Sequence, residues 1–257
     1  MSPSSHHPLT IDGQTVQIAT AAELVVALDV LQGQYDRQVL AQLRPHLAGL
    51  MHRPADFLNV MKSLAPEDQV YLIGALGARL APILKEARFL RDLLATLAEG
   101  KVEDALLGAL GRDGLRALIL TADELAEVLE WVYGETDKEL LEALGLDYVR
   151  RLCRTAADLG GVLHSLDNSL QEKLVDQLGW EFVLGLVQDG RGLAALLRAL
   201  PAAVSDRLLG HFSPEQLQAI IGNARDWAYL YQRLEPDEAA TLTQILALNP
   251  HGGKAHA

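Results

Sequence analysis

Apolar residues recur along most of the chain at the spacing of an amphipathic helix. In the clearest example they occupy positions i, i+3, i+4 and i+7: Leu125, Val128, Leu129 and Val132. Residues 159–166 and 193–200 repeat this series. A strand-like alternation of apolar and polar residues stands out only at 15–18, which we interpret as the irregular start of the first repeat. The pattern predicts an all-α fold.

A sequence repeat sets the spacing of these helices. A Leu-Gly pair recurs every 34 residues, and Phe212-Ser213 takes the next position: Leu76-Gly77, Leu110-Gly111, Leu144-Gly145 and Leu178-Gly179. An apolar column eight residues further on keeps the same register: Leu84, Leu118, Leu152, Leu186 and Ile220. A fixed period of this length is typical of helical repeat architectures.

The period divides the chain into seven repeats, preceded by a disordered arm at 1–8 and followed by a frayed tail at 246–257. The predicted repeats are 9–42, 43–75, 76–109, 110–143, 144–177, 178–211 and 212–245. Each contains about three short helices, which cannot bury their apolar faces alone. Successive repeats must therefore stack, and we expect a single-domain α-solenoid.

Capping residues mark where helices begin and end inside a repeat. A helix N-cap residue is followed three positions later by an acid in the pairs Thr20/Glu23, Thr121/Glu124, Thr155/Asp158 and, by looser analogy, Asn223/Asp226. Further helices are expected to start at Pro66, Pro201 and Pro236. The glycine of the next Leu-Gly pair is expected to end them.

The acidic composition narrows the possible partners. Lys and Arg number 22 against 34 Asp and Glu, which gives a net charge of −12 and disfavours binding to nucleic acid or an anionic membrane surface. The single Cys153 and the lack of Cys/His clusters fit a reducing compartment. Residues 1–8 have neither a basic start nor an apolar stretch, and no run of about 18 apolar residues occurs, so we expect no signal peptide and no membrane span. We expect a cytoplasmic, bacterial protein without membrane insertion.

Two segments resemble known helical families. The string at 200–209, LPAAVSDRLL, is similar to the N-terminal domain of magnesium transporters and to flagellar motor switch proteins. The string at 212–223, FSPEQLQAIIGN, resembles the opening of a repeat in transcription-activator-like effectors, and Pumilio repeats share the three-helix plan. These resemblances imply a helical repeat fold; no functional residue is carried over from them.

Motifs for catalysis or cofactor binding are missing from the sequence. It has no nucleophile-elbow, P-loop or dinucleotide-binding pattern, and its eight histidines show no metal-ligand spacing. Gly190 and Gly192 are interpreted as an inter-helix turn. Cys153 occupies a column that is otherwise apolar, so we expect a core residue rather than a nucleophile. The sequence predicts a non-enzyme without cofactor or metal.

Charged residues offer two candidate binding features. Acids are dense at 123–142, where Glu127 and Glu130 are either a docking patch for a basic segment of a partner or part of a solvated helix face. Arg116 and Arg150 share one column of the repeat. They either bind an anion or an acidic peptide, or they neutralise neighbouring acids.

Aromatic residues offer a third candidate. Leu146 and Trp180 share one column and Tyr148 and Phe182 another, so these four form either a partner-binding patch or packing between helices. In the last repeat, Trp227, Leu230 and Tyr231 match core columns, whereas Tyr229 faces elsewhere. An exposed Tyr229 suggests self-association through the C-terminal repeat.

Together these features favour a non-enzymatic, protein-binding adaptor or scaffold with an acidic helical-repeat surface. Two alternatives stay open. The repeat length permits a modular nucleic-acid-binding protein, which the net charge opposes, and the resemblance at 200–209 permits a regulatory domain of a transporter or motor assembly.

Overall fold

The computed structural model describes residues 6–31, 33–97, 100–132, 135–222, 224–232, 234 and 236–247. These residues are mostly helical, with one two-stranded sheet near the N-terminus. The chain separates into two compact units. Unit 1 comprises 1–120 and 131–144, and unit 2 comprises 121–130 and 145–257. The cap pair of Asn223 and the expected tail from 248 onwards lie outside the described residues.

Unit 1 contains the sheet and the first helices of the chain. Its elements are β1 (His7–Ile11), β2 (Gln14–Ile18), α1 (Ala21–Leu31), α2 (Asp36–Leu43), α3 (Leu47–Leu50), α4 (Pro54–Lys62), α5 (Pro66–Leu76), the 3-10 helix η1 (Gly77–Arg79), α6 (Leu80–Leu84), α7 (Ala87–Leu94), α8 (Lys101–Leu118) and α10 (Glu135–Leu144).

The regular elements of unit 2 are all helices among its described residues. Its elements are α9 (Ala122–Leu129), α11 (Leu146–Leu152), α12 (Ala156–His164), α13 (Asn168–Leu178), α14 (Trp180–Leu186), α15 (Gly190–Ala199), α16 (Ala202–Gly210), α17 (Pro214–Ile220), α18 (Ala224–Tyr231) and α19 (Pro236–Ala247). The predicted order of three short helices per repeat is present in α11, α12 and α13 of repeat 144–177, and again in α14, α15 and α16 of repeat 178–211.

The described residues fit the predicted all-α fold except for one small sheet near the N-terminus. The alternating residues at 15–18 belong to β2, which pairs antiparallel with β1 so that Leu9 lies opposite Val16. Strand β1 begins at His7, inside the segment expected to be a disordered arm. The turn between the strands is Asp12-Gly13, with φ of 49° and 80°. Asp-Gly is a typical type I′ hairpin turn, and it was the missed sequence signal.

The repeated Leu-Gly glycines all adopt a positive φ. Gly77, Gly111, Gly145 and Gly179 all have positive φ, between 51° and 81°, which a residue with a Cβ adopts only with strain. Helices α5, α10 and α13 end at the leucine of the pair, as predicted. Helix α8 instead continues through Gly111 with a kink. The repeat therefore marks the points where the chain turns from one helix into the next.

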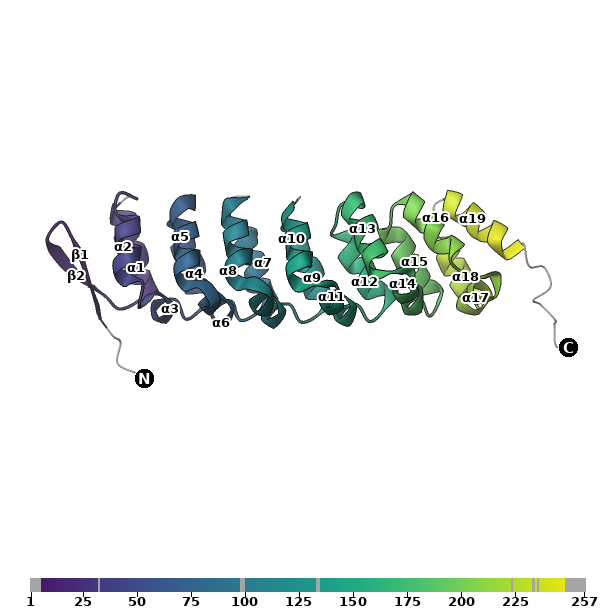
Figure 1. Ribbon diagram of the computed structural model, residues 1–257, viewed down its shortest axis with the longest axis horizontal. Coiled ribbons are helices and arrows are strands. Elements are labelled where there is room, and N and C mark those ends of the chain that lie inside the picture. Colours follow the sequence, from purple (N-terminus) through teal and green to yellow (C-terminus); the bar gives the residue numbers. More distant parts are fainter. Residues whose placement is uncertain are drawn as a thin grey trace. The chain divides into compact units, whose positions relative to one another are not determined.

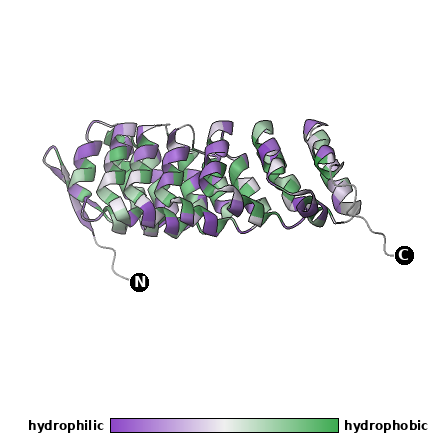
Figure 2. Cartoon of the chain, turned by 45° about the vertical axis from the view of Figure 1, so that its right-hand side comes forward, coloured by the Kyte–Doolittle hydropathy of each residue, from purple (hydrophilic) through white to green (hydrophobic). Residues whose placement is uncertain are grey.

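Helices one repeat apart pack against each other within unit 2. Helix α12 contacts α9 on one side and α15 on the other, and α15 also contacts α18 (Figure 1). Their apolar stripes are buried, and Leu125, Leu159 and Leu193 are each 0% exposed. Individual helices carry hydrophobic and hydrophilic residues on different sides (Figure 2). The helical periodicity in the sequence thus identified the packing faces.

Glycines allow the closest of these approaches. A Cβ on Gly160 of α12 would lie 3.0 Å from the carbonyl oxygen of Ala195 in α15. Gly190 and Gly192 lie in the first turn of α15, so their interpretation as an inter-helix turn is wrong. A Cβ on Gly190 would lie 3.1 Å from the Cβ of Asp226, and one on Gly192 would lie 3.2 Å from the Cβ of Ala156.

Unit 1 shows the same kind of packing. Helix α1 packs on α4, α2 on α5, and α5 on α8, which also contacts α10. Leu40, Leu72 and Leu106 are each 0% exposed and belong to the core of these helices.

Predicted caps are present wherever the structure describes them. The Thr121 and Thr155 side chains accept hydrogen bonds from the backbone N–H three residues later, and the acids Glu124 and Asp158 accept the reciprocal bonds. Thr20 and Glu23 make the same reciprocal pair. Capping depends on neighbours within four residues, which is why the sequence alone predicted it.

Candidate functional site

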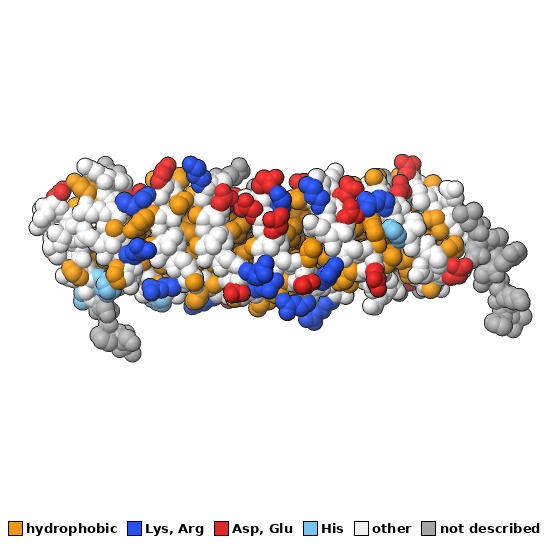
Figure 3. Space-filling view, viewed as in Figure 1, with side chains coloured by type: hydrophobic (Ala, Val, Ile, Leu, Met, Phe, Trp, Pro, Cys, Tyr) orange, Lys and Arg blue, Asp and Glu red, His pale blue; other side chains and the backbone are white. Residues whose placement is uncertain are grey.

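The first helices of two successive repeats in unit 2 carry a half-exposed apolar surface. Leu146 and Tyr148 lie on α11, and Trp180 and Phe182 lie on α14, one repeat later. We call these four residues the aromatic surface. All four are half-buried, whereas the intervening Val149 and Val183 are each 0% exposed. Hydrophobic side chains reach the surface of these helices beside charged ones (Figure 3).

The Leu-Gly repeat positions this surface. Gly145 and Gly179 have φ of 78° and 81°, and each immediately precedes its short helix. The two apolar residues that follow each glycine lie in the first turn, so they take equivalent places on α11 and α14. One valine per helix anchors it in the core, which leaves the aromatic surface on the outside.

Trp180 is held by contacts from α16 and the residue after it. The centroids of the Trp180 and His211 rings are 4.6 Å apart, and the Arg207 guanidinium lies 5.2 Å from the centroid of the Trp180 ring. Arg207 also donates to Glu172 at 2.8 Å and to Asp176 at 2.5 Å. These contacts fix the indole beside charged side chains and leave it partly exposed.

The other rings also lie beside arginines. The Arg150 guanidinium is 5.9 Å from the centroid of Phe182, and the Arg151 guanidinium is 5.0 Å from that of Tyr148. The surface therefore combines flat apolar rings with guanidinium cations that lie over them. That combination is typical of the energetically important centre of a protein interface.

Arg116 and Arg150 make equivalent contacts in the two units. In unit 1, Arg116 of α8 donates through Nε to the carbonyl oxygen of Leu144 at 3.0 Å and through Nη2 to the same oxygen. In unit 2, Arg150 donates to Leu178 O at 2.8 Å and lies 3.6 Å from Asp147. Each arginine thus caps the C-terminal end of a helix about 28 residues later in the chain. The sequence pattern identified the column but not this backbone role.

The two predicted acidic residues lie on the surface of unit 2. Glu127 is on α9 and Glu130 occupies the C-cap position, and both side chains are exposed. The next buried positions are Val128 and Leu129, at 0% and 1% exposed. The exposure of Glu127 and Glu130 fits both alternatives, a docking patch and a solvated helix face.

Cys153 is a core residue, as its apolar column predicted. It is 1% exposed, and burial, with a smaller contribution from the Asp158 carboxylate, raises the pKa of its thiol to about 12. The thiolate that a nucleophile or metal ligand needs is therefore disfavoured at neutral pH. No group of three or more His, Cys, Asp or Glu side chains suited to a metal ion occurs among the described residues.

The C-terminal aromatics are arranged differently from the prediction. Leu230 is buried, but Tyr231 is 54% exposed, so its assignment to the core is wrong. Tyr229 is half-buried, and the Arg191 guanidinium lies over its ring, 5.6 Å from the ring centroid. In earlier repeats the equivalents of Tyr231 are Leu163 and Leu197, which lie on helices packed against a following helix. No described helix takes that place beside α18.

Comparisons with known proteins give no relative. Neither the models of known protein families, nor the curated proteins, nor the solved structures contain a significant match to this chain. Among the described residues, no helix has both the length and the apolar character needed to cross a membrane.

Proposed function

We propose that this chain is an α-solenoid that serves as a non-enzymatic adaptor or scaffold for another protein. The observation that carries the proposal is the aromatic surface, which presents Leu146, Tyr148, Trp180 and Phe182 at matched positions of consecutive repeats. Half-exposed aromatic rings on well-packed helices bind a partner with little loss of side-chain entropy.

Repetition of one packing arrangement supports the solenoid. The contacts of α9, α12, α15 and α18 in unit 2, and those of α2, α5, α8 and α10 in unit 1, follow the order of the repeats. In such a stack each repeat contacts mainly its neighbours, and the outer faces of successive repeats form an extended surface for binding.

The charge of the chain suggests the chemistry of the partner. A net charge of −12 attracts a basic segment, for which Glu127 and Glu130 are the proposed contacts in unit 2. The same net charge opposes binding of nucleic acid. In addition, the arginines that could contact phosphates, Arg116 and Arg150, already donate hydrogen bonds to backbone carbonyls. A modular nucleic-acid-binding protein is therefore the alternative that the experiment must separate.

Affinity purification from the native organism tests the proposal. The wild-type chain is compared with W180A/F182A and with E127K/E130K, and eluates are analysed for protein and nucleic acid at low and high salt. Trp131→Ala is the matched control, because Trp131 is 41% exposed but lies outside the aromatic surface.

We expect a stoichiometric protein that stays bound at high salt, is lost with W180A/F182A and is retained by W131A. Charge reversal at Glu127 and Glu130 should weaken its binding. Nucleic acid that is recovered at low salt and released steeply by added salt would contradict the proposal and favour the nucleic-acid-binding alternative.

A further inference from the structure

Helix α1 is apolar on all sides although one of its faces is uncovered. Nine of its eleven residues are Ala, Val or Leu. Leu24 and Leu28 are buried, and α1 packs on α4. On another face, however, Val26 is 61% and Val30 73% exposed. A helix without a polar face is typical of a position covered on all sides, so this face of α1 is suited to a further packing partner.

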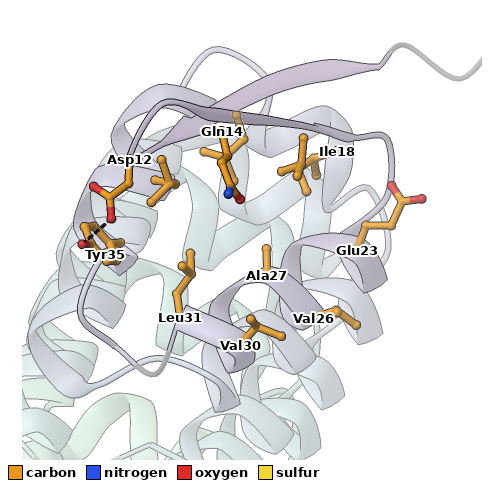
Figure 4. Close-up of a pocket in the computed structure, with 12 residues that line it drawn as sticks. Asp12, Gln14, Ile18, Glu23, Val26, Ala27, Val30, Leu31 and Tyr35 are labelled. Carbon is orange, nitrogen blue, oxygen red and sulfur yellow. Dashed lines mark hydrogen bonds between the residues drawn. The ribbon is translucent and has the colours of Figure 1, made fainter.

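The hairpin covers α2 and leaves this face of α1 open. The Gln42 side chain on α2 accepts from Thr10 N at 3.0 Å and donates to Thr10 O at 2.8 Å, which fastens β1 to α2. Strand β2 lies on the outer side, where Val16 is 50% exposed. Between β2 and α1 runs an open groove of about 530 Å³ (Figure 4).

The groove has apolar walls and acidic ends. Val26, Ala27 and Val30 project from α1 on one side, opposite the hairpin (Figure 4). Asp12 lies at one end, where it accepts a hydrogen bond from Tyr35 at 2.7 Å, and Glu23 lies at the other. None of the described residues that line the groove is Lys, Arg or His.

Glu23 is charged at neutral pH. Its Oε2 accepts from Ala19 N at 2.7 Å and from Thr20 N at 3.1 Å. The bond from Ala19 is the largest cause that holds the pKa of this carboxyl below its usual range. A cationic side chain that reaches this end of the groove would therefore meet a carboxylate.

We propose that this groove binds an amphipathic helix of a partner protein, with an apolar stripe on Val16, Val26 and Val30 and with Lys or Arg beside Asp12 and Glu23. The row Glu23, Val26, Ala27, Val30 follows the i, i+3, i+4, i+7 spacing of a helix ridge, against which a second helix packs. Such a helix would complete the burial of α1.

Charge favours a basic partner helix over a second copy of this chain. Two copies docked through the same groove would bring Asp12 and Glu23 of one close to those of the other, and each copy carries a net charge of −12. The groove lies in unit 1 and shares no residue with the aromatic surface of unit 2. The two proposals can therefore fail separately.

A synthetic helical peptide tests the proposal on the full-length chain. The probe carries Leu along one face and Lys on both sides of that face, with a fluorescent label for anisotropy. One matched peptide has Glu in place of every Lys, and another has a central Pro that breaks the helix. We expect binding of the Lys peptide and none of the other two.

Variants locate the binding site. Val26→Ser with Val30→Ser should weaken binding of the Lys peptide by about tenfold or more, because both side chains lie in the apolar wall. D12N/E23Q should weaken it and reduce its salt dependence. Leu120→Ser is the matched control: Leu120 is 64% exposed and lies outside the groove, so its loss should leave affinity unchanged.

Four results would overturn the proposal: equal binding of the Lys and Glu peptides, equal binding of the Pro peptide, unchanged affinity of V26S/V30S, or no binding of the Lys peptide. A wild-type dimer that V26S/V30S converts to a monomer would assign the groove to a second copy and refute the partner helix. Both valines are largely exposed, and matching circular dichroism spectra of V26S/V30S and L120S will show that folding is intact.

Discussion

At the residue scale, the spacing between helices depends on single glycines. Adjacent Gly160 and Gly161 of α12 differ sharply in their surroundings: a Cβ on Gly160 would meet the Ala195 carbonyl oxygen, whereas a Cβ on Gly161 would have nothing within 4 Å. Backbone atoms cannot rotate away as a side chain can. The close approach of α12 and α15 therefore requires glycine at 160 only.

We predict opposite effects of alanine at these two positions. Gly160→Ala should lower the free energy of unfolding by about 1–3 kcal/mol, as overpacking does. Gly161→Ala should raise it by about 0.5–1 kcal/mol, because alanine favours the helix. Urea unfolding measures both, and equal effects of the two substitutions would show that α12 and α15 are not in this close contact.

Two buried aspartates of unit 1 have carboxyl pKa values shifted in opposite directions. Asp36 is 1% exposed, its Oδ1 has no hydrogen-bond partner, and desolvation followed by repulsion from Asp68 and Asp29 raises its pKa. Asp56 receives hydrogen bonds from Arg53 at 2.7 and 2.9 Å, and the pKa of its carboxyl is lowered chiefly by them.

Asparagine at these positions should therefore have opposite consequences. We expect Asp36→Asn to raise the free energy of unfolding at pH 7 by about 1 kcal/mol and Asp56→Asn to lower it by a similar amount. The raised pKa makes wild type lose stability as pH rises through the titration of Asp36. The lowered pKa makes it lose stability as pH falls through that of Asp56. The difference in the free energy of unfolding between wild type and each variant should shrink in acid. Denaturation at several pH values measures it. A D56N variant more stable than wild type would refute this account.

At the element scale, arginines connect the first helix of a repeat to the end of its third helix. Arg150 of α11 donates to the last carbonyl of α13, and Arg116 of α8 does the same for α10. A guanidinium at a helix C-terminus satisfies a carbonyl that has no partner inside the helix and also interacts favourably with the helix dipole. These bonds fix the C-terminal end of the third helix of a repeat against the first helix of the same repeat.

Arg150→Ala should lower the free energy of unfolding by about 1 kcal/mol. Arg151→Ala is the neighbouring control: its exposed side chain lies over Tyr148, and its loss should cost less than about 0.5 kcal/mol. Thermal unfolding followed by circular dichroism compares the two variants. Equal losses would mean that the bond to Leu178 contributes nothing specific.

Elements set by local sequence were predictable, and those set by distant neighbours were not. Thr121 and Thr155 cap their helices through bonds to the next turn, so the capping boxes were correct. Strand β2 depends on pairing with β1; residues 15–18 alone did not reveal that partner, and the Asp12-Gly13 turn that indicates the hairpin was missed. Gly192 looked like a turn residue because the sequence does not show Ala156 packed against it.

The same limit applies to the candidate site. The columns that contain Leu146, Tyr148, Trp180 and Phe182 identified a shared surface because equivalent repeat positions take equivalent places. The sequence did not show that Arg207 lies over Trp180, since these residues come from different helices. It placed Tyr231 in the core by the same column rule, which holds only where a following helix covers the position.

At the scale of the whole molecule, the central proposal is that the repeats form an α-solenoid. Small-angle X-ray scattering of the monodisperse chain tests it most directly. A compact globule of 257 residues would have a radius of gyration of about 18 Å, and a solenoid of the same length exceeds that value by several ångströms. We predict the larger value. A radius of gyration of about 18 Å would contradict the stack and with it the proposed extended binding surface.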